Sequence, residues 1–125
     1  MVDRLGTFVP SSWDPDTIER EFRGLACLPA CCRRERVSVR IPQGLPVMTD
    51  NLAWHQDGGG PAGTTDHMVI WASERPTDLA MPDGEIVPME PLAVVRFDNR
   101  RCWHKQPTGT NESTRWFVAI RCSGA

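Results

Sequence analysis

Hydrophobic and polar residues alternate with a period of two in Arg36–Ile41, and the chain beyond it consists of short β-rich runs. Short runs rich in β-branched and aromatic residues are separated by Gly, Pro, Asn and Asp, a pattern that predicts strands joined by turns. The predicted strands are Arg36–Ile41, Asp66–Ala72, Asp78–Met81, Glu85–Met89, Leu92–Phe97, Arg101–Gln106 and Arg115–Cys122. With the segment that leads into His55 they number about eight, which favours a β-sandwich or jelly roll.

One short helix is predicted ahead of these strands. Asp14 is a suitable N-cap, and Pro15 fits the first helical position, where its missing N–H costs nothing. The helix should run to about Phe22 and end at Gly24. The expected fold class is therefore mainly β, a jelly roll with one short N-terminal helix.

Length and composition indicate a single domain over residues 1–125. A chain of 125 residues is long enough for one core. Its 24% charged residues and net charge of −2 give no general attraction to nucleic acid or an anionic membrane. No apolar stretch approaches the length of a membrane span, and Met1–Arg4 begins neither a signal nor a transit peptide. We expect a cytoplasmic protein.

Five cysteines, an odd number, fit reduced thiols better than a disulfide framework. Cys27, Cys31 and Cys32 lie close together but lack a paired C-x-x-C. Buried structural thiols are favoured over a second metal site, and the role of the three stays open.

The strongest chemical signal is a set of three metal-ligand side chains. His55 and Asp57 are two residues apart, so on a strand both side chains point the same way and could bind one ion. His104 follows in the segment Phe97–His104. Two imidazoles and one carboxylate form the facial triad that leaves open positions on a non-heme Fe(II).

The residues around these ligands resemble known metal-binding segments. Trp54–Asp57 is similar to the metal-binding segment of phytanoyl-CoA dioxygenase-like proteins, and Phe97–His104 resembles the distal-histidine segment of taurine dioxygenase-like proteins. Both groups belong to the Fe(II)- and 2-oxoglutarate-dependent oxygenase superfamily. The resemblance covers about residues 50–122 and implies a double-stranded β-helix (jelly roll, cupin-like) core.

The resemblance also implies a basic residue beyond the distal histidine that binds the far carboxylate of 2-oxoglutarate. Arg115 stands eleven residues beyond His104. On the predicted strand, Arg115, Phe117, Ala119 and Arg121 share one face. A guanidinium on a largely apolar face needs an anion, and a dicarboxylate would supply one. Arg121 lies about 20 Å from Arg115 along the strand, so only one of them can serve, and the spacing favours Arg115.

The activity that the resemblance implies is hydroxylation of an unidentified substrate with release of succinate and carbon dioxide. Fe(II) would be held by His55, Asp57 and His104, and 2-oxoglutarate by Arg115. No tyrosine is present to assist Arg115, so Thr49, Asn51, Ser113 or Thr114 would supply the hydroxyl or amide. The third histidine, His67, is expected to face solvent at the start of its strand.

The chain is shorter than most members of the superfamily it resembles, with only 53 residues before the metal motif. A reduced core could need a homo-oligomer to cover an exposed face, or could accept a macromolecular substrate in an open groove. Strand parity places His104 on the opposite face from Trp103, which then needs cover outside or at an interface. Small-molecule and macromolecular substrates both stay open.

Two alternatives come from other functional classes. One is a non-catalytic jelly-roll module that keeps the oxygenase shell for binding or structure. The other is a mononuclear metal enzyme that works without 2-oxoglutarate. The basic groups Arg33–Arg36 and Arg100–Arg101 are short and interrupted, so solvated faces explain them better than nucleic-acid binding does.

Overall fold

The computed structural model describes residues 2–26, 33–41, 54–56, 65–107 and 114–124. The protein is mainly β, with antiparallel sheets and one short helix, as the alternating pattern predicts. The elements are β1 (Val2–Thr7), α1 (Pro15–Arg23), β2 (Arg33–Ile41), β3 (Thr65–Ala72), β4 (Asp78–Ala80), β5 (Ile86–Val87), β6 (Ala93–Asp98), β7 (Trp103–Lys105) and β8 (Arg115–Gly124).

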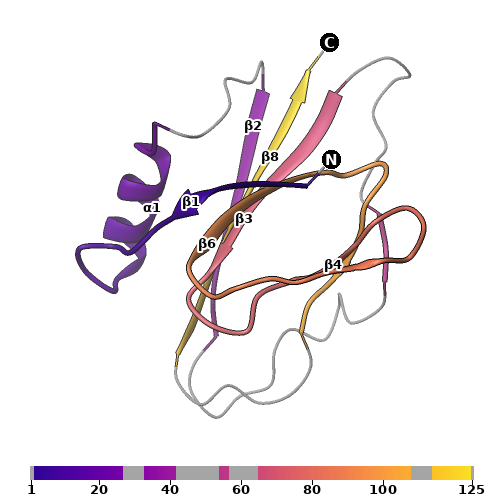
Figure 1. Cartoon of the computed structure of the whole chain (residues 1–125). Coiled ribbons are helices and arrows are strands. Elements are labelled where there is room, and N and C mark those ends of the chain that lie inside the picture. The colour runs from indigo at the N-terminus through magenta and orange to yellow at the C-terminus, as the bar shows by residue number, and fades with distance from the viewer. Residues whose placement is uncertain (1, 27–32, 42–53, 57–64, 108–113, 125) are drawn as a thin grey trace.

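The strands form two antiparallel sheets. The major sheet has the order β1-β6-β3-β8-β2, and the minor sheet has the order β5-β4-β7. Helix α1 lies on one side of the major sheet, and the minor sheet lies on the other side (Figure 1). The major sheet is therefore covered on both faces in the part of the chain that the structure describes.

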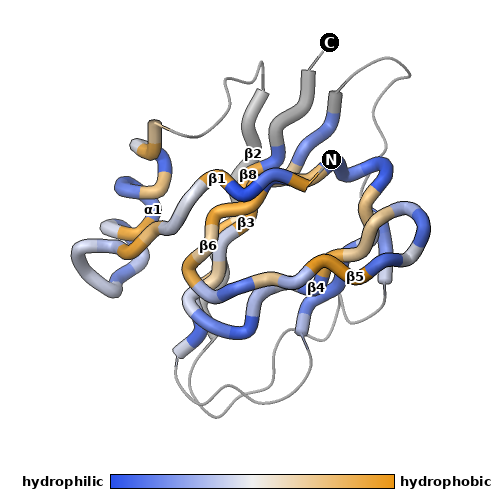
Figure 2. The backbone as a smooth tube through the Cα atoms, viewed as in Figure 1, coloured by the Kyte–Doolittle hydropathy of each residue, from blue (hydrophilic) through white to orange (hydrophobic). Residues whose placement is uncertain are grey.

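Two clusters of buried side chains correspond to these two sides. The first joins Phe22 of α1 to Trp71 of β3 and Val118 of β8. The second joins Leu79 of β4 to the opposite face of the major sheet, where Phe117 lies. Even and odd residues of β8 thus enter different clusters, which confirms the parity predicted for this strand. Apolar segments of the major sheet and of β4 and β5 face each other in Figure 2.

The helix is found where its capping residues predict it. The Asp14 carboxylate accepts a hydrogen bond of 2.9 Å from the backbone N–H of Thr17, and Pro15 is the first helical residue. The helix ends at Arg23, one residue beyond the expected Phe22, and Gly24 caps it with hydrogen bonds to the last-turn carbonyls. An N-cap carboxylate satisfies one of the unpaired N–H groups of the first turn, which fixes the start of the helix.

Strand β1 is not among the predicted strands. It forms the edge of the major sheet and pairs only with β6. Its sequence carries Asp3 and Arg4 at neighbouring positions and a glycine with φ of 135° at Gly6. An edge strand of this kind lacks the apolar alternation by which a strand is recognised.

The predicted strand Arg101–Gln106 is shorter in the structure. The amide groups of Arg101 and Cys102 both donate to the carbonyl of Asp98, at 3.3 and 3.0 Å, and this turn delays β7 until Trp103. The segment before β8 and the cysteines at 27, 31 and 32 lie outside the described residues. No helix in the described part of the chain is long and apolar enough to cross a membrane.

Candidate functional site

His55 and His104 face each other across a pair of antiparallel segments. Two backbone hydrogen bonds join them, His55 N to His104 O at 3.0 Å and His104 N to His55 O at 2.9 Å. Residues paired directly across an antiparallel ladder project their side chains to the same face. Their ring centroids lie 4.2 Å apart. The structure thus brings together two of the three predicted metal ligands.

This pair faces the space between the sheets. His104 is only 7% exposed, and its ring centroid lies 5.1 Å from that of Phe97 in the second core cluster. Cys102 and Gln106, two residues to either side of His104, are also buried, whereas Trp103 is 39% exposed. This alternation confirms the predicted parity of the strand: His104 points inward and Trp103 points outward.

The separation of the imidazoles suits a shared ion. Imidazole nitrogens bind a metal such as zinc at about 2 Å, so two nitrogens on one ion lie at most about 4 Å apart. Rings whose centroids are 4.2 Å apart can meet this limit. Asp57, the third predicted ligand, lies outside the described residues. Within the described residues no group of three His, Cys, Asp or Glu side chains could hold a metal ion.

Arg115 is fully buried between the sheets. Its Nε donates to the backbone carbonyls of Glu74 and Arg75, both at 3.1 Å, and one terminal nitrogen, Nη2, donates to Gln106 Oε1 at 3.2 Å. Its other terminal nitrogen, Nη1, is buried without a hydrogen-bond partner among the described residues. The guanidinium also lies 5.0 Å above the ring of Phe117. No carboxylate in the described part of the chain forms a salt bridge with it.

The uncompensated charge of Arg115 is reflected in its pKa. Burial in a poorly solvated site, with a smaller contribution from the positive charge of Arg75, lowers the pKa of Arg115 to about 10, and Glu74 opposes this only in part. A lowered pKa means that the surroundings disfavour the charged guanidinium. An anion bound at Nη1 would reverse that effect.

Arg115 is connected through Gln106 to the segment that carries His104. It contacts Gln106, which is two residues from His104 on the same strand face, about 7 Å along an extended chain. The Gln106 side chain that contacts the guanidinium therefore lies on the same face of this segment as the His104 ring.

Two polar residues near Arg115 were not predicted as part of the site. Gln106 orients the guanidinium through its amide oxygen. Thr77 is 2% exposed, and its hydroxyl has no hydrogen-bond partner among the described residues. Thr77 precedes Asp78, the register partner of Lys105, and this places Thr77 next to Gln106. Strand parity could have indicated Thr77, because residues 77 and 79 share a strand face and Leu79 is apolar, but the predicted strand begins one residue later, at Asp78.

Arg121 is paired with the carboxylate of Asp66. Its Nε and Nη2 donate to the two oxygens of Asp66, at 3.1 and 2.6 Å, and Asn99 donates to the same carboxylate at 2.9 Å. Burial opposes ionisation of Asp66, but the hydrogen bonds from Arg121 and Asn99 outweigh it and lower its pKa. Of the two arginines on this face of β8, only Arg115 is left without an acidic partner in the described residues.

The Asp66 interaction predicts acid-sensitive stability. Because the pKa of Asp66 is lowered on folding from 3.8, its contribution is present above pH 3.8 and is lost as the pH falls further. Asp66→Asn should reduce the free energy of unfolding by about 1–3 kcal/mol at pH 7. The difference in free energy of unfolding between the wild type and Asp66→Asn, measured by urea denaturation, should shrink below pH 3.8. Asp16→Asn, at an exposed helix position, should change stability by less than about 0.5 kcal/mol.

The remaining candidates lie elsewhere or outside the described residues. His67 is half-buried and shares its strand face with Val69 and Trp71, on the α1 side of the sheet. It was expected to face solvent, and it is away from the histidine pair. Thr114 is half-buried, while the hydroxyl and amide candidates Thr49, Asn51 and Ser113 lie outside the described residues.

A groove of about 400 Å³ opens at the other edge of the two sheets. It runs between β1 and the segment around β5, and its lining includes Val87, Met89 and Val95. Leu79 is the register partner of both Val87 and His104, and it is fully buried between them. The groove is therefore separated from the histidine pair and is not part of this candidate site.

Comparisons with family models, curated proteins and solved structures find no match to this chain.

Proposed function

We propose that the chain is an Fe(II)- and 2-oxoglutarate-dependent oxygenase that hydroxylates an unidentified substrate and releases succinate and carbon dioxide. The observation that carries the proposal is the position of Arg115. A buried arginine without a carboxylate partner among the described residues is hydrogen-bonded to Gln106, two residues from His104, whose ring centroid lies 4.2 Å from that of His55. Burying an unpaired charge is costly, so this arrangement favours an anionic ligand at the histidine pair.

The path of the chain between the sheets supports a double-stranded β-helix for this fold. β2 lies in the major sheet, His55 pairs with β7 of the minor sheet, and β3 returns to the major sheet. β4 and β5 lie in the minor sheet, β6 in the major, β7 in the minor and β8 in the major. A chain that passes repeatedly between two facing antiparallel sheets forms a roll, the arrangement of jelly-roll proteins.

The two histidines in the described residues are suitable donors for Fe(II). His55 and His104 would hold the metal with Asp57, and Arg115 would bind the far carboxylate of 2-oxoglutarate. Bound Fe(II) with 2-oxoglutarate and oxygen supplies the chemistry that hydroxylates a C–H bond. Gln106 fixes the orientation of the guanidinium, and the Thr77 hydroxyl can donate to the same carboxylate. The apolar surroundings, including Phe97 and Phe117, exclude water and strengthen these contacts.

An oxygen-free titration of the full chain with Fe(II) and then 2-oxoglutarate tests the proposal. We expect a weak visible charge-transfer band that requires both additions and is absent in Asp57→Ala. Fe(II) binding without a response to 2-oxoglutarate would indicate a metal enzyme of another kind. Binding of neither would leave a non-catalytic β module. Screening metabolite extracts for succinate release would then search for the substrate.

A further inference from the structure

Three of the exposed large hydrophobic side chains in the described residues lie on the outer face of the minor sheet. Ile86 is 61% exposed, Trp103 39% and Trp54 37%. Ala80 of β4 is the register partner of both Ile86 and Trp103, so the side chains of Ile86, Ala80 and Trp103 stand in a row. Ala80 is 4% exposed and belongs to neither core cluster. Exposed apolar rows of this kind mark interaction surfaces.

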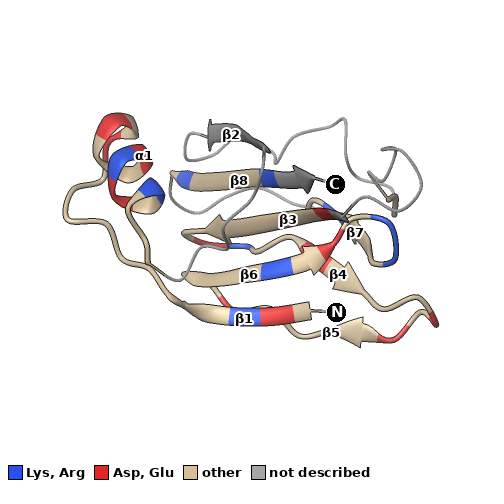
Figure 3. Ribbon diagram, turned by 90° about the horizontal axis from the view of Figure 1, so that it is seen from above, with Lys and Arg blue, Asp and Glu red and all other residues tan. Residues whose placement is uncertain are grey.

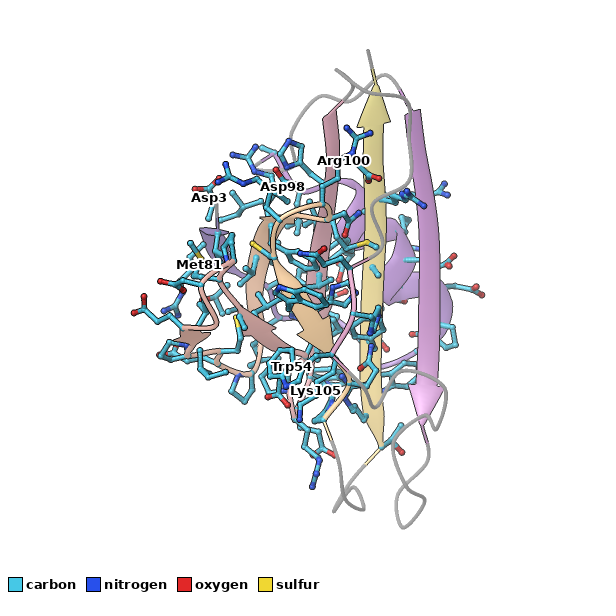
Figure 4. All side chains as sticks on the ribbon, turned by 90° about the vertical axis from the view of Figure 1, so that its right-hand side faces the viewer. Asp3, Trp54, Met81, Asp98, Arg100 and Lys105 are labelled. Atoms are coloured by element: carbon cyan, nitrogen blue, oxygen red, sulfur yellow. The ribbon has the colours of Figure 1, made fainter. Side chains whose placement is uncertain are left out.

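A second row on the same face carries one acid and one base. Asp78 of β4 and Lys105 of β7 are register partners, so they lie next to each other. The Lys105 ammonium is 5.0 Å from the centre of the Trp54 ring, and the two side chains lie together in Figure 4. The row has no net charge, so it offers no strong attraction to a polyanion or to a polycation.

We propose that this face binds the same face of a second copy of the chain. We call it the outer minor-sheet face, and it consists of Trp54, Asp78, Ala80, Ile86, Trp103 and Lys105. A two-fold dimer brings identical patches together, so the patch must be complementary to itself. An acid beside a base meets this condition, because Lys105 of each copy can lie over Asp78 of the other. The apolar row supplies the aromatic centre typical of such interfaces.

The size of the face determines how tight the dimer should be. Four neighbouring chain segments spaced by about 4.8 Å span only about 14 Å. Stable interfaces bury about 800 Å² on each partner, more than this short sheet provides. The net charge of −2 gives little repulsion between copies. We therefore expect a reversible dimer that forms and dissociates with concentration.

The inference rests on strand register and exposure and does not depend on the proposed chemistry. The two are connected only in space, since Trp54 and Trp103 directly adjoin His55 and His104 in sequence and project to the other side of the same sheet. Pairing of two copies would cover the back of the histidine pair. In Figure 3, charged positions are marked on β1, β6 and β8 of the major sheet and along α1.

Sedimentation velocity of the full chain over a wide range of concentration tests the dimer. We expect the wild type to shift from monomer to dimer and Trp103→Glu to stay monomeric. Val9→Glu adds the same charge at an exposed apolar residue (61%) outside this face, and it should dimerise like the wild type. Circular dichroism checks that each variant is folded.

Two charge variants make the test specific to the proposed pairing. Asp78→Lys gives two bases in the patch and Lys105→Asp gives two acids, so each alone should weaken self-association about tenfold or more. Mixing these two variants should restore a dimer that contains one copy of each. A wild type that stays monomeric, a dimer unaffected by Trp103→Glu, or a mixture that fails to associate would each overturn the proposal.

Discussion

Replacing His104 by Ala should abolish Fe(II) binding at the candidate site, with an affinity loss of more than about a hundredfold. Loss of residues that only orient a metal ligand already costs about 10–100-fold, so loss of a ligand should exceed that range. His104 is buried opposite His55, and one imidazole with a single carboxylate would be left to hold the ion. The 2-oxoglutarate-dependent charge-transfer band should disappear, together with succinate release.

His67→Ala is the matched control for this experiment. His67 also lies in a strand, where it is half-buried, but it is on the α1 side of the major sheet. It should leave Fe(II) affinity and the visible band unchanged. Since removal of the His104 ring leaves a space beside Phe97, His104→Gln provides a second variant that fills more of it. Equal Fe(II) affinity in the wild type and in folded His104→Gln would contradict a role for His104 as a ligand.

The inward face of the candidate site could be predicted because strand parity is a local property. Alternation around His104 separates Cys102 and Gln106 from Trp103 and Lys105, and the burial of these residues follows that alternation. The same rule separates Arg115 and Phe117 from Val118 on β8. Once a strand is recognised, its two faces follow from geometry alone.

Partners distant in the chain could not be predicted in this way. Arg121 was a rival to Arg115 until the structure placed Asp66, 55 residues away, against its guanidinium. The carbonyls that hold Arg115 come from Glu74 and Arg75, where the chain turns with a left-handed φ of 47° at Arg75. A non-glycine residue with a left-handed φ is uncommon, and an arginine at this position does not predict one. The pairing of His55 with His104 likewise depends on the fold and was reached only through the resemblance.

The two arginines of β8 should respond in opposite ways to replacement by methionine. In Arg115→Met the ligand-free protein loses three hydrogen bonds worth about 1 kcal/mol each. It also loses a buried charge whose pKa of about 10 corresponds to a cost of about 3 kcal/mol. These effects offset each other, so the free energy of unfolding should change by no more than about 1–2 kcal/mol, while the response to 2-oxoglutarate is lost.

Arg121→Met should instead destabilise the protein by about 3–5 kcal/mol, because it leaves the carboxylate of Asp66 buried without its cation. Where this variant remains folded, it should still bind 2-oxoglutarate with near wild-type affinity, since Arg121 lies about 20 Å along the strand from Arg115. Urea denaturation and 2-oxoglutarate titration of the Fe(II)-loaded proteins measure the two effects separately. If 2-oxoglutarate stabilises the wild type no more than it stabilises Arg115→Met, Arg115 does not bind the carboxylate. A large loss of ligand-free stability in Arg115→Met would mean that its guanidinium is held for the fold and not for an anion.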